Sequence, residues 1–195
     1  RVRPNASHGG SEVLIIDEDR DDLFAITTWV LDHLGLNTLH ARIETSDTRT
    51  TINSFIVLEE NGEPIAEGMR MHEVQQRLTD SLATLDHIPA ASTRRIPRQL
   101  RHFDIETRIN FSQDSANHRT VLHLETADRP GLLALIGLVF SECSIRLMNA
   151  KVATIGEQVD DTFYILDRHD RQIEDEAQQE RIRERLLHYL KTTYE

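Results

Sequence analysis

The turn Asp-Arg-Pro-Gly-Leu at residues 128–132 holds the residue types in this sequence that are best suited to binding chemistry. A glycine at the start of a helix lets backbone amides approach an anion, and the helix dipole favours negative charge there. Pro130 fixes the turn that precedes Gly131 and Leu132. The Asp128 carboxylate can accept hydrogen bonds from a cationic group, or it can cap the helix. The turn therefore predicts a small anion site with a carboxylate beside it, and both roles of Asp128 remain open.

The sequence lacks the patterns of several other kinds of chemistry. The chain has no Gly-x-x-x-x-Gly-Lys or Gly-x-Gly-x-x-Gly loop, and its ten histidines form no metal-binding pattern. The one cysteine, Cys143, excludes an intramolecular disulfide and lies in an apolar stripe, which favours a buried structural thiol. No nucleophile and base stand in an enzyme-like arrangement. We expect no catalytic centre, metal site or cofactor in this chain.

The charge balance and hydropathy of the chain limit its partners. Lysine plus arginine is 22 and aspartate plus glutamate is 33, so the net charge is 22 − 33 = −11. Such a chain lacks the clustered cations that bind nucleic-acid phosphates. No apolar run approaches the roughly 18 residues of a membrane helix, and no signal peptide opens the chain. We therefore expect neither nucleic acid nor membrane as a partner, and the reducing cytoplasm as the location.

An internal repeat organises the whole chain. When Asp19 is aligned with Asp128, a shift of 128 − 19 = 109, residues 13–65 match residues 122–173 along their full length. After one deleted residue the shift becomes 108. Identical matches include Leu23 with Leu132, Val30 with Val139, Ala41 with Ala150, and Phe55 with Phe163. A period of this length suits a small domain that has been duplicated and is too long for a solenoid repeat.

Both copies show the same order of predicted elements. A short apolar strand, at 13–16 and 121–124, precedes the turn, and a helix with one apolar stripe follows it. A second strand, at 36–45 and 145–154, changes the phase of its apolar alternation part-way along, which predicts a bulge. A third strand and a second amphipathic helix complete each copy.

A further strand is predicted near residues 103–111, between the two copies. It either closes the first copy or opens the second. We favour the second alternative, which implies a matching strand before Ser7 in the first copy. A proline-containing linker separates the copies. The sequence thus predicts domains at residues 1–88 and 102–195, with the linker at 89–101.

The order of elements and the Asp-Arg-Pro-Gly-Leu-Leu turn resemble ACT domains. The resemblance implies an α+β fold of two ferredoxin-like ACT domains in tandem, each an antiparallel sheet with two helices on one face. The second copy, with ADRPGLLALIGLVF and NAKVATIGEQVDDTFYI, is similar to the C-terminal ACT domain of bacterial PII-protein uridylyltransferase/uridylyl-removing enzymes. The first copy, with GGSEVLIIDEDRDDLFA, is similar to the first ACT domain of that family. The resemblance covers nearly the whole chain.

The family resemblance implies that the chain is the regulatory part of an enzyme and carries no catalytic activity itself. In that family a nucleotidyltransferase domain adds UMP to the PII nitrogen-signalling protein, and a hydrolase domain removes it. L-glutamine is the signal, and the ACT pair is the expected glutamine sensor. Mg²⁺ is expected only in the catalytic domains, which precede the ACT pair. The implied partners are L-glutamine, the chain's own catalytic domains, the PII protein through the parent enzyme, and a second ACT pair in a homodimer.

In ligand-binding ACT domains, a polar residue early in the second strand also contacts the amino acid. Asn37 has this position in the first copy and fits the pattern. Arg146 has it in the second copy and departs from the pattern, so it is either a ligand contact or a plain edge or surface arginine. Asp22 stands where the other copy has Gly131 and would repel a carboxylate, so the first copy alone is a poor site, although it can supply Asn37 to a shared pocket. The amino-acid site predicted by the resemblance consists of Asp128, Arg129, Pro130, Gly131, Leu132, Arg146 and Asn37.

A ligand-free interaction module is the alternative function. In that case the pair binds its own catalytic domains, or another ACT pair, without an effector. The altered first turn and the unusual Arg146 favour this alternative.

Overall fold

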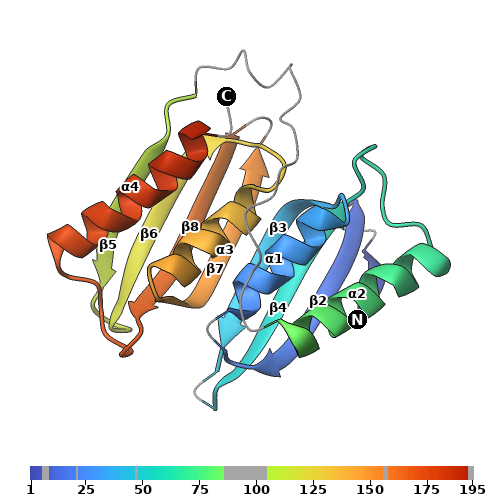
Figure 1. Cartoon of the computed structure of the whole chain (residues 1–195), viewed down its shortest axis with the longest axis horizontal. Coiled ribbons are helices and arrows are strands. Elements are labelled where there is room, and N and C mark those ends of the chain that lie inside the picture. The colour runs from blue at the N-terminus through green and yellow to red at the C-terminus, as the bar shows by residue number, and fades with distance from the viewer. Residues whose placement is uncertain (6–8, 21, 47, 86–104, 156–157, 193–195) are drawn as a thin grey trace.

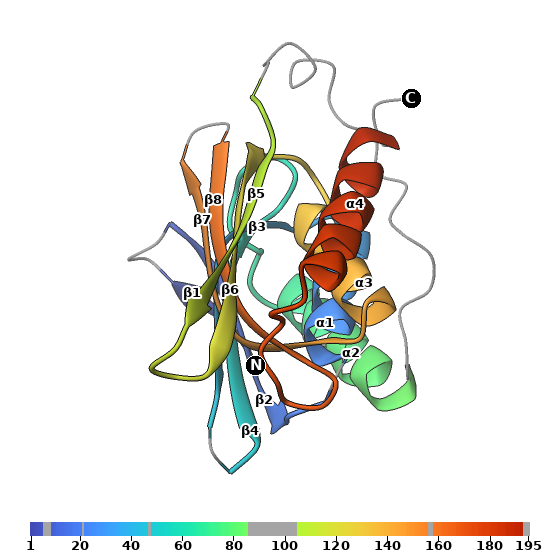
Figure 2. The same ribbon diagram turned by 90° about the vertical axis from the view of Figure 1, so that its left-hand side faces the viewer.

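The computed structural model of the chain describes residues 1–5, 9–20, 22–46, 48–85, 105–155 and 158–192. Their strands form one 8-stranded antiparallel sheet in the order β1-β2-β4-β3-β7-β8-β6-β5. The helices α1 to α4 all cover the same face of this sheet (Figure 2). The predicted α+β class is confirmed: each half of the sheet is antiparallel and carries two helices on one face.

The first unit forms the half of the sheet that carries α1 and α2 (Figure 1). Its elements are β1 (Val2–Asn5), β2 (Gly10–Glu18), α1 (Leu23–His33), β3 (Asn37–Thr45), β4 (Thr50–Leu58) and α2 (Met69–Thr84). Nearly all of α1 is buried, because it packs on the sheet and contacts α2 on one side and α3 on the other. By contrast, α2 buries only Val74 and Leu78 and leaves its other face to solvent.

The second unit repeats this arrangement with α3 and α4. Its elements are β5 (Arg108–Asp114), β6 (Arg119–Ala127), α3 (Leu132–Glu142), β7 (Ile145–Ile155), β8 (Gln158–Asp167) and α4 (Glu176–Thr192). The apolar stripe predicted for the first helix of this unit is buried, and Cys143 at its end is a buried free thiol. Within the described residues, no helix combines the length and the apolar character needed to cross a membrane.

The strand predicted near residues 103–111 belongs to the second unit. The structure places it at β5, which pairs antiparallel with β6. The matching strand of the first unit is β1, which pairs with β2 and sets Val2 opposite Val13. The predicted domain boundaries at 88 and 102, and the linker at 89–101, fall within residues 86–104 and lie outside the described residues.

The phase change predicted in the second strand of each copy corresponds to an irregular register in the sheet. The β3–β4 register shifts between Thr38 and His40, and the β7–β8 register shifts between Leu147 and Asn149. These bulges stand at equivalent positions of the repeat, as the change in apolar alternation predicted. Each bulge redirects the first residues of its strand relative to the rest of the strand.

The two units share one core as well as one sheet. Strands β3 and β7 pair across the boundary, with Ala41 opposite Val152. Above them α1 packs closely against α3: a Cβ atom added to Gly137 would stand 2.7 Å from the Cα atom of Ala25. Phe140 lies between the units in a ring cluster with Phe24 and Phe163. This pairing decides which turn of one unit meets which strand of the other.

Candidate functional site

Two corners of the boundary between the units are equivalent by the internal repeat. Because β3 and β7 are antiparallel, the start of each strand lies near the end of the other. The start of β3, with Asn37, therefore meets the turn between β6 and α3. The start of β7, with Arg146, meets the turn between β2 and α1. We call these two places the β3 corner and the β7 corner.

The β3 corner holds a cavity of about 270 Å³. Residues 128–134, at the start of α3, form its wall from the second unit. From the first unit, Asn37 and Thr38 of β3 and Thr28 and Asp32 of α1 line it. The volume is close to the lower end of the range for small-molecule sites. The cavity is lined by both units, as a pocket shared between the two copies requires.

The structure brings six of the seven predicted site residues together at this cavity. They are Asp128, Arg129, Pro130, Gly131, Leu132 and Asn37. Gly131 is the N-cap residue of α3 and has a φ angle of 76°, a left-handed conformation that glycine adopts without strain. The N-cap residue is thus Gly131 itself, and the alternative that Asp128 serves as the N-cap is wrong. Residues 131–134 at this helix start line the cavity, and the Leu132 amide donates to the Arg129 carbonyl oxygen at 3.3 Å.

Arg129 is buried and holds the end of α4. Its guanidinium donates to the carbonyl oxygens of Leu190, at 3.1 Å, and Tyr189, at 3.3 Å. A cation at the C-terminal end of a helix complements the helix dipole. Arg129 thus lines the cavity while its positive charge is directed to the carbonyl end of α4.

Asp161, on β8, is a cavity residue that the sequence analysis missed. Its side chain is 0% exposed, and its Oδ1 atom accepts a hydrogen bond from the Ala153 amide at 3.2 Å. Its Oδ2 atom has no hydrogen-bond partner among the described residues. Burial, together with the nearby charges of Asp128 and Asp160, raises the pKa of Asp161 to about 7. The signal was present in the sequence: Asp161 takes an inward position in the alternation of Val159, Phe163 and Ile165.

Two further carboxyl groups face the same space. Burial raises the pKa of Asp128, which stands in the turn before α3. Asp32, at the end of α1, is 4% exposed, and its carboxyl atoms stand 3.2 to 3.3 Å from where a Cβ atom of Gly131 would be. In the described part of the chain, no three His, Cys, Asp or Glu side chains are grouped so that they could hold a metal ion. The carboxyl groups of Asp161, Asp128 and Asp32 make the cavity an acidic site next to the start of α3.

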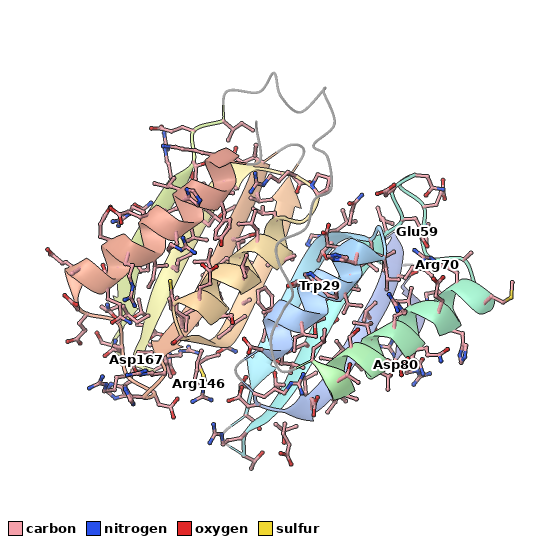
Figure 3. The ribbon with its side chains drawn as sticks, in the orientation of Figure 1. Trp29, Glu59, Arg70, Asp80, Arg146 and Asp167 are labelled. Carbon is pink, nitrogen blue, oxygen red and sulfur yellow. The ribbon has the colours of Figure 1, made fainter. Side chains whose placement is uncertain are left out.

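The β7 corner is closed by Arg146, the seventh predicted residue. Arg146 is 8% exposed and forms ion pairs with Asp19, which is equivalent to Asp128, and with Asp170. The cavity at this corner is only about 20 Å³. Figure 3 shows Arg146 at the lower side of the molecule, where the units meet. The expectation of a plain edge or surface arginine is wrong, because this side chain is buried, and Arg146 does not line the cavity of the β3 corner.

Comparison with known proteins finds relatives of the chain. No protein-family model matches it. A bifunctional uridylyltransferase/uridylyl-removing enzyme of Pseudomonas fluorescens Pf-5 is 39% identical over 188 residues, which is 96% of this chain and 21% of that enzyme. The enzyme of the same name from Legionella pneumophila Corby is 44% identical over 164 residues, 84% of this chain and 19% of that enzyme. This chain is homologous to a segment of the uridylyltransferase/uridylyl-removing enzymes.

The chain spans about a fifth of the length of these relatives. Among solved structures, an aspartate kinase from Synechocystis matches with a TM-score of 0.47 and 14% identity, over 93% of this chain and 27% of that kinase.

Proposed function

We propose that this chain is the regulatory module of a uridylyltransferase/uridylyl-removing enzyme and that it senses L-glutamine in the cavity of the β3 corner. The observation that carries the proposal is the cavity itself, where a helix start and buried carboxyl groups from both units face one small space. An amino acid carries its α-carboxylate and its ammonium group on the same carbon atom. The cavity offers the start of a helix to the carboxylate and carboxyl groups to the ammonium.

The ligand's α-carboxylate is assigned to the first-turn amides of α3. Gly131 has a positive φ angle and no Cβ atom, and the helix start at residues 131–134 lines the cavity, where the helix dipole favours an anion. The ligand's ammonium group is assigned to the acidic side of the cavity, which Asp128 and Asp161 line.

Neutral polar groups complete the site toward the first unit. Asn37 can donate and accept hydrogen bonds, and the hydroxyl groups of Thr28 and Thr38 lie in the same wall. An amide side chain suits these groups. The second carboxylate of L-glutamate would meet a cavity that is already acidic, so the site should favour glutamine over glutamate.

On the same homology we propose the setting of the module. The catalytic domains of the parent enzyme transfer UMP to and from the PII protein, bind Mg²⁺ themselves, and work in the cytoplasm. Glutamine bound to the module shifts the balance of the two activities through contacts with those domains. Such coupling is reciprocal, so a bound catalytic domain must change the glutamine affinity by the same factor.

Thermal unfolding of the 195-residue chain with and without millimolar L-glutamine tests the proposal. At a concentration about 100-fold above the dissociation constant, a ligand adds about 2.7 kcal/mol to stability, which is roughly 5 to 10 °C for a chain of this size. L-glutamate should give a smaller shift. The absence of a shift with glutamine would contradict the proposal and favour the ligand-free interaction module.

The variant Asn37→Arg locates the site. It places at the β3 corner the residue that closes the β7 corner, where an arginine pairs with the equivalent aspartate. The variant should fold and lose the glutamine shift, because the new guanidinium pairs with Asp128 and fills the cavity. His40→Arg, a change to the same residue on the exposed side of β3, is the matched control and should keep the shift. If glutamine raises the melting temperature of Asn37→Arg as much as that of the unchanged chain, the ligand does not bind at the β3 corner.

A further inference from the structure

Asp161 stands at a position where the other corner has a neutral residue. By the shift of 161 − 53 = 108, its counterpart is Asn53, which is buried and accepts a hydrogen bond from the Thr51 hydroxyl at 2.8 Å. Asp161 is equally buried, yet its Oδ2 atom has no partner among the described residues and lies in the wall of the cavity. A buried carboxyl oxygen without a partner is costly unless a donor reaches it.

The two corners also differ in their cations. At the β7 corner, the guanidinium of Arg146 neutralises the carboxylate of Asp19. At the β3 corner the equivalent of that arginine is Asn37, while the equivalent carboxyl group, Asp128, is kept and Asp161 is added. The β7 corner therefore contains within the chain the cation that the β3 corner lacks at the same place.

We propose that Asp161 is a specificity-determining residue that accepts the ammonium group of the ligand in the β3 corner, and that ligand binding releases a proton from the cavity. This inference rests on the proposed amino-acid site and deepens it. Arg146 shows within the same fold where a positive charge is held at a corner of this kind. The chemical class of ligand is accordingly one that carries a primary ammonium group.

The proton release follows from the groups that face Asp161. Asp160 adjoins it on β8, Asp128 faces it from the turn before α3, and Asp32 and Glu60 line the cavity from the first unit. The cation in the wall, Arg129, donates to carbonyl groups of α4. Burial raises the pKa of Asp161 to about 7, so we expect this carboxyl group to bind a proton in part near neutral pH when no ligand is bound. An ammonium group binds the ionised form, so affinity should fall about tenfold from pH 8 to pH 6.

The test measures amino-acid affinity of the 195-residue chain by calorimetry at pH 6 and pH 8. The probes are L-glutamine, a panel of the other common L-amino acids, and 4-carbamoylbutanoate, which is glutamine without its ammonium group. The variant is Asp161→Asn, a shape-conserving change to the residue that the fold already holds at the equivalent position. Asp160→Asn, which removes the same charge from the exposed side of the same strand, is the matched control.

The expected result is a tenfold loss of glutamine affinity from pH 8 to pH 6 in the unchanged chain. Asp160→Asn should lose affinity in the same direction, with a lower pKa of Asp161 because one of the charges that raise it is removed. In Asp161→Asn, affinity should be at least tenfold weaker at pH 8 and equal at the two pH values, and 4-carbamoylbutanoate should bind weakly throughout.

If a different amino acid shows this pattern, the role of Asp161 stands and glutamine sensing fails. If glutamine binds Asp161→Asn as tightly as the unchanged chain, or its deaminated analogue binds equally well, the role of Asp161 is wrong and glutamine sensing stands. Binding of no amino acid at either pH overturns both.

Discussion

Replacing Asp161 by asparagine should change how the stability of the unliganded chain depends on pH. The carboxyl group is fully buried, and its Ala153 hydrogen bond goes to one oxygen that asparagine can reproduce. The substitution therefore removes a titrating group with little change of shape. Any difference in pH dependence between the two proteins then reports the ionisation of this one side chain.

The sign of the effect follows from the direction of the pKa shift. The pKa of Asp161 is raised from 3.8 to about 7 in the folded chain, because burial disfavours the charged form. The folded state thus holds the proton more tightly than the unfolded state. The stability that the protonated group contributes is fully present below about pH 4 and is lost as the pH rises through 7.

The magnitude follows from the same two values. A difference of about 3.2 units corresponds to about 4 kcal/mol at 1.36 kcal/mol per unit. Most of it is lost between pH 5 and pH 8, because the folded group ionises around pH 7. Relative to Asp161→Asn, the unchanged chain should therefore become about 3 kcal/mol less stable over this range.

Urea unfolding at pH 5, 6, 7 and 8 and constant ionic strength measures this difference. Asp128 contributes in the same direction, since burial raises its pKa too, but it is present in both proteins and largely cancels. Asp160→Asn should lose stability in the same direction as the unchanged chain, with the midpoint at lower pH, because the charge of Asp160 contributes to the raised pKa of Asp161. A stability difference between the unchanged chain and Asp161→Asn that stays constant from pH 5 to pH 8 would refute the reasoning. Asp161 would then be ionised throughout, and its second oxygen would have a partner.

The remaining predictions concern the contacts that join the two units. Arg146→Asn should cost about 3 kcal/mol in urea unfolding, because it removes a buried arginine and leaves the partly buried carboxylate of Asp19 without its cation. Arg42→Asn, which breaks an exposed ion pair, should change stability by less than about 0.5 kcal/mol, and equal effects of the two would show that burial of Arg146 does not matter. Gly137→Ala should destabilise the chain by about 1 to 2 kcal/mol, because its Cβ atom would stand 2.7 Å from the Cα atom of Ala25 and force α1 and α3 apart. A gain in melting temperature, as an alanine gives in an unobstructed helix, would contradict this packing.

Much of the fold could be predicted from the sequence because it depends on local patterns. The apolar stripe of α3 and the phase change in β7 are both visible in one dimension, and the repeat shows each pattern twice. The turn at residues 128–132 was also predictable, since proline and glycine restrict the backbone there whatever surrounds them. The strand near residues 103–111 was also predicted, and the favoured alternative, in which it opens the second copy, agrees with the pairing of β5 with β6. Local patterns alone left both alternatives open, because pairing depends on contacts distant in sequence.

The candidate site was only partly predictable for the same reason. Asp161 was overlooked because a carboxyl group at an inward strand position becomes informative only when its surroundings are known. Arg146 was placed in the wrong corner. The repeat put Arg146 in the same copy as the turn at residues 128–132, so the two were assigned to one site.

By itself the sequence determined the duplicated unit, the helix faces, the bulges and the turn with its glycine, because each arises from neighbours along the chain. The tertiary structure decided how the copies join. Antiparallel pairing of β3 with β7 brings the start of each strand to the turn of the other copy, so Asn37 meets Asp128 and Arg146 meets Asp19. One corner is thereby closed by an arginine and the other stays open and acidic. The physical reason is that antiparallel pairing reverses the direction of one copy relative to the other, so each turn meets a strand of the other copy. Patterns within a single copy do not predict this pairing.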